Sequence, residues 1–243
     1  MSTTAPVTDS AGTPPKSLAP ALHTVALIAI LLVFSFGGAD SQQGFAERTG
    51  RIGFYLITMA VELAMVGYVA WGIRRSGTSL RELIGGHWST AEDVLLDLVI
   101  AIGFWVVSAL VLAGLAWMMG LTHPGQLTEM KKKVDFLLPH DAREMVVWVV
   151  LSASAGFCEE VIFRGYLQKQ FAAWTQHAWL GVVLQGVCFG ASHAYEGHAR
   201  MLIIAVYGMM FGALAMARKS LRPGMIAHAW QDSIAGLAFR LLR

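Results

Sequence analysis

Two adjacent glutamates, Glu159 and Glu160, stand at the end of an apolar run and are followed by Arg164. On a helix, Glu160 and Arg164 are four positions apart and can form an ion pair, whereas Glu159 is rotated by about 100° and points elsewhere. We therefore expect Glu160 and Arg164 to form a structural pair and Glu159 to be free to act as a general base on water. The alternative is that both glutamates only cap a helix end at a membrane surface.

Two histidines stand on separate apolar segments further along the chain. Phe189 and His193 are four residues apart, and so are His228 and Asp232, so that each pair shares one helix face. Asp232 can therefore orient the His228 imidazole or join it at a metal or substrate. A single histidine of this kind is more often structural than catalytic. Three such motifs together supply a base for water and groups that bind a metal or stabilise an oxyanion, and a helix bundle can bring them to one interior site.

These polar residues are exceptions in a chain that carries little charge. Hydrophobic residues make up 56% of the 243 residues and charged residues only 14%, whereas an ordinary soluble domain carries roughly 25% charged residues. The mean hydropathy is +0.56. This composition argues against a disordered chain, a secreted disulfide scaffold and a nucleic-acid-binding protein. It indicates a protein that lies mostly in lipid, where each buried charge costs several kcal/mol and so marks function.

The pattern of apolar stretches predicts an all-α, polytopic transmembrane bundle with about seven membrane helices. Residues 1–20 are rich in Ser, Thr, Ala and Pro and are predicted to be a flexible tail. Residues 21–243 are predicted to be one integral membrane domain, with the motifs in 144–243. The first apolar stretch could instead be a cleaved signal peptide; we favour a retained helix because the preceding tail is long and has a single positive residue. The apolar stretches are 21–38, 52–73, 94–120, 144–163, 178–193, 201–217 and 223–242.

Other features of the sequence concern packing and the membrane surface. Small residues four apart in the fifth and sixth stretches predict close helix packing; these are Gly186 with Gly190, and Gly208 with Gly212.

The loop 121–143 contains three consecutive lysines followed by apolar residues, which suits either an interfacial helix beside anionic headgroups or an ordinary basic loop. Positive residues are divided almost equally between the two sides of a seven-helix topology, so charge favours neither orientation.

Two more charges, Glu62 and Asp97, lie inside apolar stretches. They are expected to hydrate the bundle or to pair across helices, and no chemistry is assigned to them. In an antiparallel run, Glu159 and His228 start from one side of the membrane and His193 from the other. We therefore expect the site to lie well inside the membrane, and the fifth helix to continue past His193 through residues 195–196.

The ordered set of motifs resembles the CPBP family of intramembrane proteases, which contains the CAAX proteases and the bacterial "Abi" or bacteriocin-processing proteins. The resemblance covers about residues 144–240. The first motif of the family is Glu-Glu-x-x-x-Arg, often followed by Gly-x-Leu-Gln; the second is Phe-x-x-x-His, and the third is His-x-x-x-Asn or Asp. The matching residues are Glu159, Glu160, Arg164, Gly165, Leu167 and Gln168, then Phe189 and His193, then His228 and Asp232.

By this resemblance, Glu159 would activate the attacking water with His193 beside it. His228 and Asp232 would bind a metal or stabilise the oxyanion. The family implies either a divalent metal such as zinc, with Glu159, His193, His228 and Asp232 as its candidate ligands, or no metal at all. The prenyl-protease branch has Asn where this chain has Asp232. Because an aspartate donates a hydrogen bond only when protonated, this difference favours a metal or a bacterial branch with a non-prenyl substrate.

The implied protein is a multi-pass endopeptidase of a bacterial cytoplasmic membrane, acting on a peptide or a membrane-associated protein. Its expected surroundings are the lipid bilayer, without nucleic acid. Two other classes of function remain open: a non-catalytic immunity or scaffold protein, and a small proton-coupled transporter that uses buried Glu and His. A rhomboid-type serine protease is disfavoured because Ser192 and His193 are adjacent and point about 100° apart on a helix.

Overall fold

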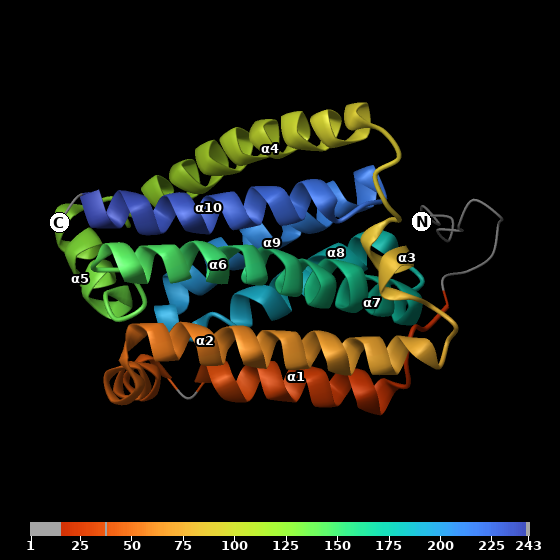
Figure 1. Ribbon diagram of the computed structural model, residues 1–243, viewed down its shortest axis with the longest axis horizontal. Coiled ribbons are helices and arrows are strands. Elements are labelled where there is room, and N and C mark those ends of the chain that lie inside the picture. Colours follow the sequence, from red (N-terminus) through yellow and green to blue (C-terminus); the bar gives the residue numbers. More distant parts are fainter. Residues whose placement is uncertain (1–15, 37, 242–243) are drawn as a thin grey trace, which may run out of the picture.

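The computed structural model describes residues 16–36 and 38–241. Every regular element in these ranges is a helix, and the long helices lie side by side along one axis (Figure 1). The predicted all-α membrane bundle is therefore confirmed. The elements are α1 (Ala21–Phe36), α2 (Gly38–Arg74), α3 (Leu80–Ile84), α4 (Ala91–Met118), α5 (Pro124–Val134), α6 (Ala142–Glu159), η1 (Glu160–Leu167), α7 (Gln168–Thr175), α8 (Ala178–Ala191), η2 (Ala194–Glu196), α9 (His198–Arg218) and α10 (Arg222–Leu241).

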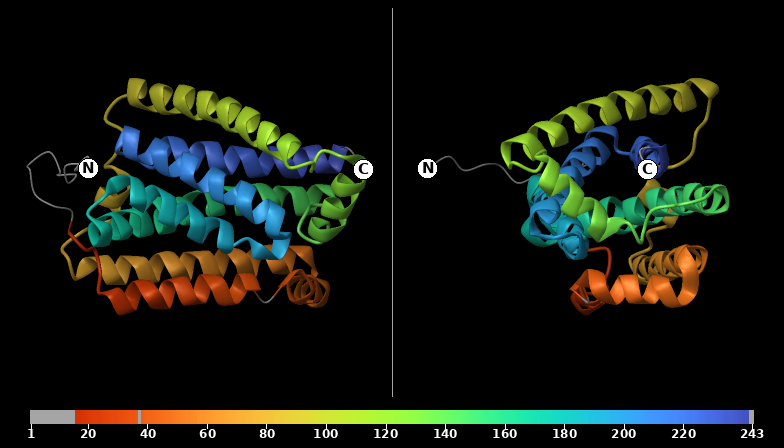
Figure 2. Two further views of the ribbon diagram at one scale, coloured as in Figure 1. Left: turned by 180° about the vertical axis from the view of Figure 1, so that it is seen from behind. Right: turned by 90° about the vertical axis from the view of Figure 1, so that its left-hand side faces the viewer.

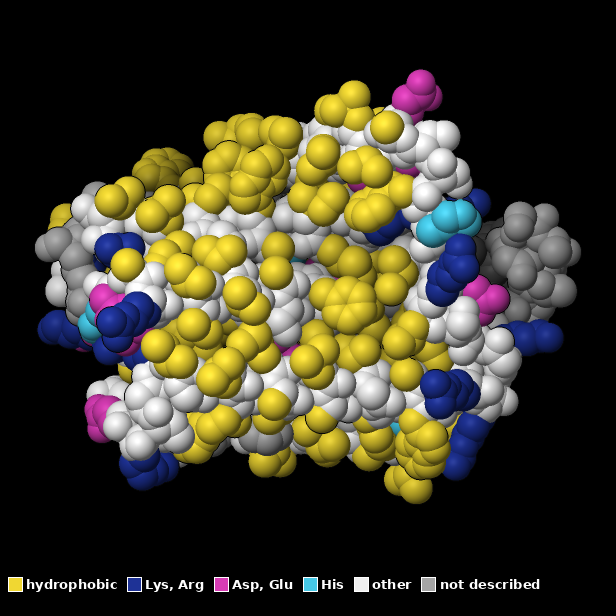
Figure 3. All heavy atoms as spheres, in the orientation of Figure 1, with side chains coloured by type: hydrophobic (Ala, Val, Ile, Leu, Met, Phe, Trp, Pro, Cys, Tyr) yellow, Lys and Arg dark blue, Asp and Glu magenta, His cyan; other side chains and the backbone are white. Residues whose placement is uncertain are grey.

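Within the described residues, each of the seven predicted apolar stretches is mostly helical. Four helices of the described ranges are long and apolar enough to cross a membrane, and α1 and α8 contain shorter apolar segments. Hydrophobic side chains cover the middle of the face seen in Figure 3, and Lys and Arg gather toward its two ends. This distribution is that of an integral membrane protein. The four long helices are Ser41–Arg74, Ala91–Met118, Ala142–Thr175 and His198–Arg218.

Helix α2 is divided by a kink at Gly50, whose φ is 71° and whose ψ is 158°. Glycine adopts this left-handed φ without the steric cost that a side chain brings. Residues 51–74 run along the bundle, while residues 38–49 turn across its end, as the right-hand view of Figure 2 shows. The apolar stretch predicted from residue 52 therefore begins just after the kink.

The fourth predicted stretch is part of a longer rod that runs without a break from Ala142 to Thr175. Its middle, η1, is a π-helix of eight residues, all of them buried. Such wide turns are rare and are found mostly at functional sites. In this rod, η1 begins at the second of the two adjacent glutamates.

The fifth helix does not continue past His193 as expected. Helix α8 ends at Ala191, and residues 194–196 form a short 3₁₀ turn before α9 begins. The reason is a contact from α1: the Ser35 hydroxyl donates to the Ala191 carbonyl at 2.7 Å and accepts from the Ala194 N–H at 2.9 Å. These bonds satisfy backbone groups that a longer helix would otherwise pair.

Helices α8 and α9 approach closely through their small residues, as predicted. A Cβ added at Gly190 would stand 2.5 Å from the Met201 carbonyl oxygen, and one at Gly186 would stand 2.9 Å from that of Ala205. Where α9 has glycine, its backbone carbonyl groups can also accept hydrogen bonds from side chains. Gln185 Nε2 donates to the Gly208 carbonyl at 2.8 Å.

Asp97 and the loop 121–143 were also singled out in the sequence. Asp97 forms ion pairs across helices with Arg218 and Arg222, each at 3.2 Å. Pairing was one of the two roles expected for this residue, the other being hydration of the bundle. The loop 121–143 contains α5, whose Lys131 ammonium lies 4.9 Å from the centre of the Phe239 ring; its place at the headgroups stays a prediction.

The part of the predicted N-terminal tail that is described is bound to the bundle. Within residues 17–19, the Leu18 N–H donates to Gln170 Oε1 at 2.7 Å, and Gln170 Nε2 donates to the Ala19 carbonyl at 2.8 Å. The remainder of the predicted tail, residues 1–15, lies outside the described residues.

Candidate active site

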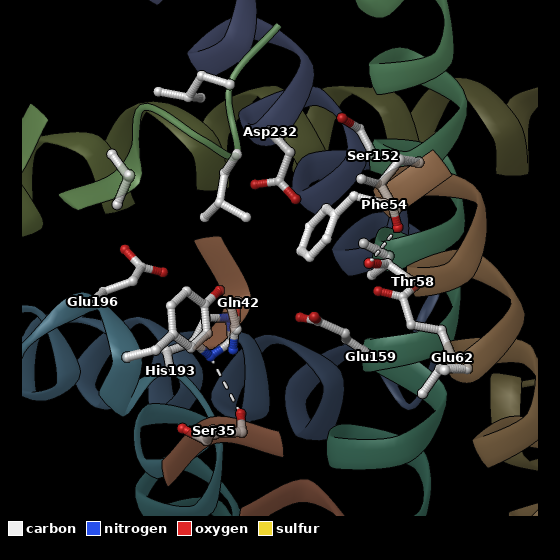
Figure 4. A pocket seen from close by; sticks show the side chains of 18 of the residues that line it. Ser35, Gln42, Phe54, Thr58, Glu62, Ser152, Glu159, His193, Glu196 and Asp232 are labelled. Atoms are coloured by element: carbon white, nitrogen blue, oxygen red, sulfur yellow. Dashed lines mark hydrogen bonds between the residues drawn. The ribbon is translucent and has the colours of Figure 1, made fainter. Parts of the chain in front are cut away.

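A cavity of about 900 Å³ opens between α1, α2, α6, α10 and the turn that follows α8. Of the six site residues predicted from the sequence, Glu159, His193 and Asp232 line this cavity. Figure 4 shows their side chains entering it from three different elements. The other three, Glu160, Arg164 and His228, are buried among the helices behind the cavity wall.

Glu160 and Arg164 form the predicted ion pair, with 3.1 Å between Arg164 Nη1 and Glu160 Oε1, and neither side chain is exposed. The guanidinium carbon also lies 4.2 Å from the Phe189 ring centre and 4.8 Å from that of Phe211. Aromatic faces attract a cation, and the attraction is stronger where water is excluded. The alternative in which Glu160 caps a helix at the membrane surface is therefore wrong.

The two adjacent glutamates point in different directions. Glu159 is the last residue of α6 and faces the cavity, whereas Glu160 is the first residue of η1 and faces the interior. Gly224 allows the start of α10 to approach this point, because a Cβ there would stand 3.0 Å from Glu160 Oε2. The predicted division between a structural and a cavity-facing glutamate holds in the geometry.

His228 connects the buried ion pair to the cavity. Its Nδ1 lies 3.2 Å from Glu160 Oε1, and its Nε2 lies 3.5 Å from Glu159 Oε2 and 3.6 Å from Asp232 Oδ2. Because the carboxylate paired with Arg164 can only accept, Nδ1–H is the donor to Glu160. This bond fixes the ring so that Nε2 faces the two carboxylates at the cavity wall.

The Phe-x-x-x-His motif also has a direct structural explanation. His193 Nδ1 lies 2.9 Å from the Phe189 carbonyl oxygen. A carbonyl only accepts, so Nδ1 carries the proton and Nε2 of the neutral ring is an acceptor. Ser192 Oγ donates to the same carbonyl at 2.8 Å. The serine hydroxyl is thus engaged along its own helix, which disfavours the serine-protease alternative.

Three residues that line the cavity were missed, or were given no role, when only the sequence was considered. Ser35 was not noticed; no local motif marks it, because its partners are about 156 residues away in the chain. Glu62 lines the cavity from α2 and is 8% exposed; its signal was a lone charge in an apolar stretch. Glu196 also lines the cavity and pairs with Arg200 at 2.8 Å; its signal was its place three residues after His193.

The residues predicted as metal ligands do not converge in this conformation. Within the described ranges, no three His, Cys, Asp or Glu side chains are arranged to hold a metal ion. His228 Nε2 meets two carboxylates, but His193 Nδ1 is committed to a backbone carbonyl. Whether the protein uses a metal stays a prediction, and we assign no reaction step to one.

Comparison with known proteins gives one match. Residues 141–234 match the family described as type II CAAX prenyl endopeptidase, Rce1-like. Neither curated proteins nor solved structures gave a match. The matched segment runs from the start of α6 to the middle of α10 and contains all three motifs. The similarity of residues 141–234, which carry the three motifs of this site, supports a relation to the CAAX/CPBP intramembrane proteases.

Proposed function

We propose that this protein hydrolyses a peptide bond held in the cavity, with Glu159 as the general base that activates water. One observation carries the proposal: Glu159, His193 and Asp232 come from three separate elements and face the same cavity of about 900 Å³. The buried pair of Glu160 and Arg164 stands directly behind them and holds the polar segment in place.

The reaction follows from the positions of the side chains. Glu159 removes a proton from water as the water oxygen attacks the carbonyl carbon of the scissile bond. His193 Nε2, left as an acceptor by the bond from Nδ1 to Phe189, helps to hold this water. When the tetrahedral intermediate collapses, the C–N bond breaks and Glu159 returns the proton to the leaving amine.

We assign to His228 the role of stabilising the negative charge that develops on the carbonyl oxygen of the substrate. Because Nδ1–H is bound to Glu160, the Nε2 atom faces Glu159 and Asp232 at the cavity wall, and in the imidazolium form it donates to an oxyanion held between them. Asp232 orients the ring from 3.6 Å. This role suits Asp232 better than direct contact with the oxyanion, since a carboxylate has no proton to donate.

The substrate is expected to be a peptide or a membrane-associated protein segment, taken from a bacterial cytoplasmic membrane. Most of the cavity wall is apolar, which suits a segment that arrives from lipid. Apolar lining residues from four elements are Leu31, Phe54, Ile57, Val61, Leu151 and Ala235.

The proposal is tested by mass spectrometry of peptide termini from membranes that contain wild type, Glu159→Ala or His193→Ala. We expect new termini with wild type only, and a matched control, Glu129→Gln on the exposed side of α5, should cleave normally. Inserted and folded wild-type protein that produces no new termini would favour the scaffold function. Proton-linked solute flux without cleavage would favour the transporter.

A further inference from the structure

A buried carboxyl group outside the matched segment has no role in the reaction described above. Glu62 lies in the middle of α2, in the most apolar part of that helix, and is 8% exposed. A carboxyl group within a membrane segment is costly and usually faces a partner or a polar cavity. Glu62 therefore needs an explanation that the ion pair and the catalytic residues do not provide.

The other buried carboxylates of the described chain each have a cationic partner, and Glu62 does not. Asp97 has Arg218 and Arg222, and Glu160 has Arg164 and His228. The hydrogen bond that Glu62 receives comes from a neutral group, Ser154 Oγ, at 3.2 Å from Glu62 Oε2. Among these three buried carboxyl groups of the described residues, Glu62 is the one that forms no ion pair.

Glu62 is aimed into the cavity beside the proposed general base. Both carboxyl groups line the cavity, Glu62 from α2 and Glu159 from α6. In Figure 4 they lie next to each other on one wall, and His193 lies on the opposite wall. A peptide bond placed between Glu159 and His193 would bring a neighbouring residue of the substrate to Glu62.

The cations that line the cavity are already engaged elsewhere. Arg200 forms an ion pair with Glu196 at 2.8 Å, and the Lys131 ammonium makes a cation–π contact with the Phe239 ring. The wall near Glu62 therefore presents carboxyl groups together with apolar side chains. Such a wall favours a positively charged group with an apolar stem, which is the construction of lysine and arginine side chains. Ile57, Val61 and Met65 of α2 also line the cavity and offer the apolar surface for that stem.

We infer that Glu62 binds a Lys or Arg side chain of the substrate close to the scissile bond and so determines which peptides are cleaved. The inference rests on the proposed function, because it takes the position of the scissile bond from Glu159 and His193. A charge-assisted hydrogen bond in a site that excludes water is strong enough to select a substrate, whereas the same contact on an open surface is not.

The test uses the purified protein in vesicles and two peptides that differ at one position beside the cleaved bond. One peptide has Lys there, and the other has norleucine, which keeps an apolar stem but lacks the ammonium group. We expect wild type to favour the Lys peptide at least about tenfold in kcat/KM. In Glu62→Gln the ratio should fall to near one, through slower cleavage of the Lys peptide. The amide oxygen of Gln can still accept from Ser154, so the substitution preserves the packing of α2 on α6.

Glu196→Gln is the matched control, because it also removes a carboxylate from the cavity wall but one that has its own arginine. It should keep the wild-type ratio. The inference is overturned if wild type shows no preference for Lys, if Glu62→Gln keeps the preference, or if folded Glu62→Gln cleaves neither peptide. These outcomes are separate from failure of the proposed function, which would appear as cleavage by Glu159→Ala.

Discussion

At the scale of single residues, the two adjacent glutamates have unlike surroundings. Glu160 is fully buried against Arg164 and His228, and Glu159 reaches the cavity. Helical spacing alone was sufficient to predict this division, because residues four apart meet and neighbours diverge. The contact between His228 and Glu160 was not predictable, since the two residues are 68 positions apart and no periodicity relates them.

The buried ion pair makes a prediction about stability. Glu160→Ala leaves the Arg164 guanidinium without its counterion inside the bundle, and such a loss typically costs 3–5 kcal/mol. We expect a lower unfolding temperature in detergent, and partial recovery in the double variant Glu160→Leu with Arg164→Met. As a control, Glu129→Ala removes an exposed pair with Lys132 and should change the unfolding temperature little. An unchanged unfolding temperature in Glu160→Ala would show that the pair is not structural.

At the scale of the elements, the apolar stretches gave the positions of the helices, but not their special local forms. The π-helix, the kink at Gly50 and the turn after Ala191 depend on packing against distant parts of the chain. The turn is the clearest case. The antiparallel topology led us to expect a helix through residues 195–196, but two hydrogen bonds of Ser35 on α1 accompany its end at Ala191 instead.

Ser35 is therefore expected to be a positioning residue for His193. Ser35→Ala removes both hydrogen bonds and leaves the Ala191 carbonyl and the Ala194 N–H without this partner. We expect kcat to fall by roughly tenfold with KM little changed, because small displacements of catalytic groups are costly. Ser35→Thr keeps the hydroxyl and should restore most of the activity. A fall in thermal stability with unchanged kcat would assign Ser35 a purely structural role.

The close contact of α8 and α9 gives a second prediction for the elements. Gly190→Ala places a methyl group against the Met201 carbonyl and should destabilise the protein by about 1–3 kcal/mol. Gly114→Ala on α4 is the matched control, because nothing lies within 4 Å of an added Cβ there. Thermal unfolding of the two variants in one detergent distinguishes them. Equal stability of both would mean that the helices do not need this approach.

At the scale of the whole molecule, the membrane bundle and the family follow from different parts of the chain. Composition and apolar stretches predicted the bundle, and three short motifs in 144–240 predicted the family that matches residues 141–234. The resemblance covered about residues 144–240, and the first three helices were expected to share only their apolar character with the family. In the structure the first two of these helices complete the site, since α1 holds the turn before η2 through Ser35 and α2 supplies Glu62 to the cavity.

The central claim is that Glu159 activates water, and Glu159→Gln tests it most directly. The substitution keeps the size of the side chain and its place at the cavity but removes the base. Cleavage of a peptide identified by mass spectrometry should be measured under single-turnover conditions for wild type and Glu159→Gln, with binding followed in parallel. We expect the rate to fall at least about a hundredfold with binding retained, as for the loss of a general base. Cleavage by Glu159→Gln at the wild-type rate would contradict the account.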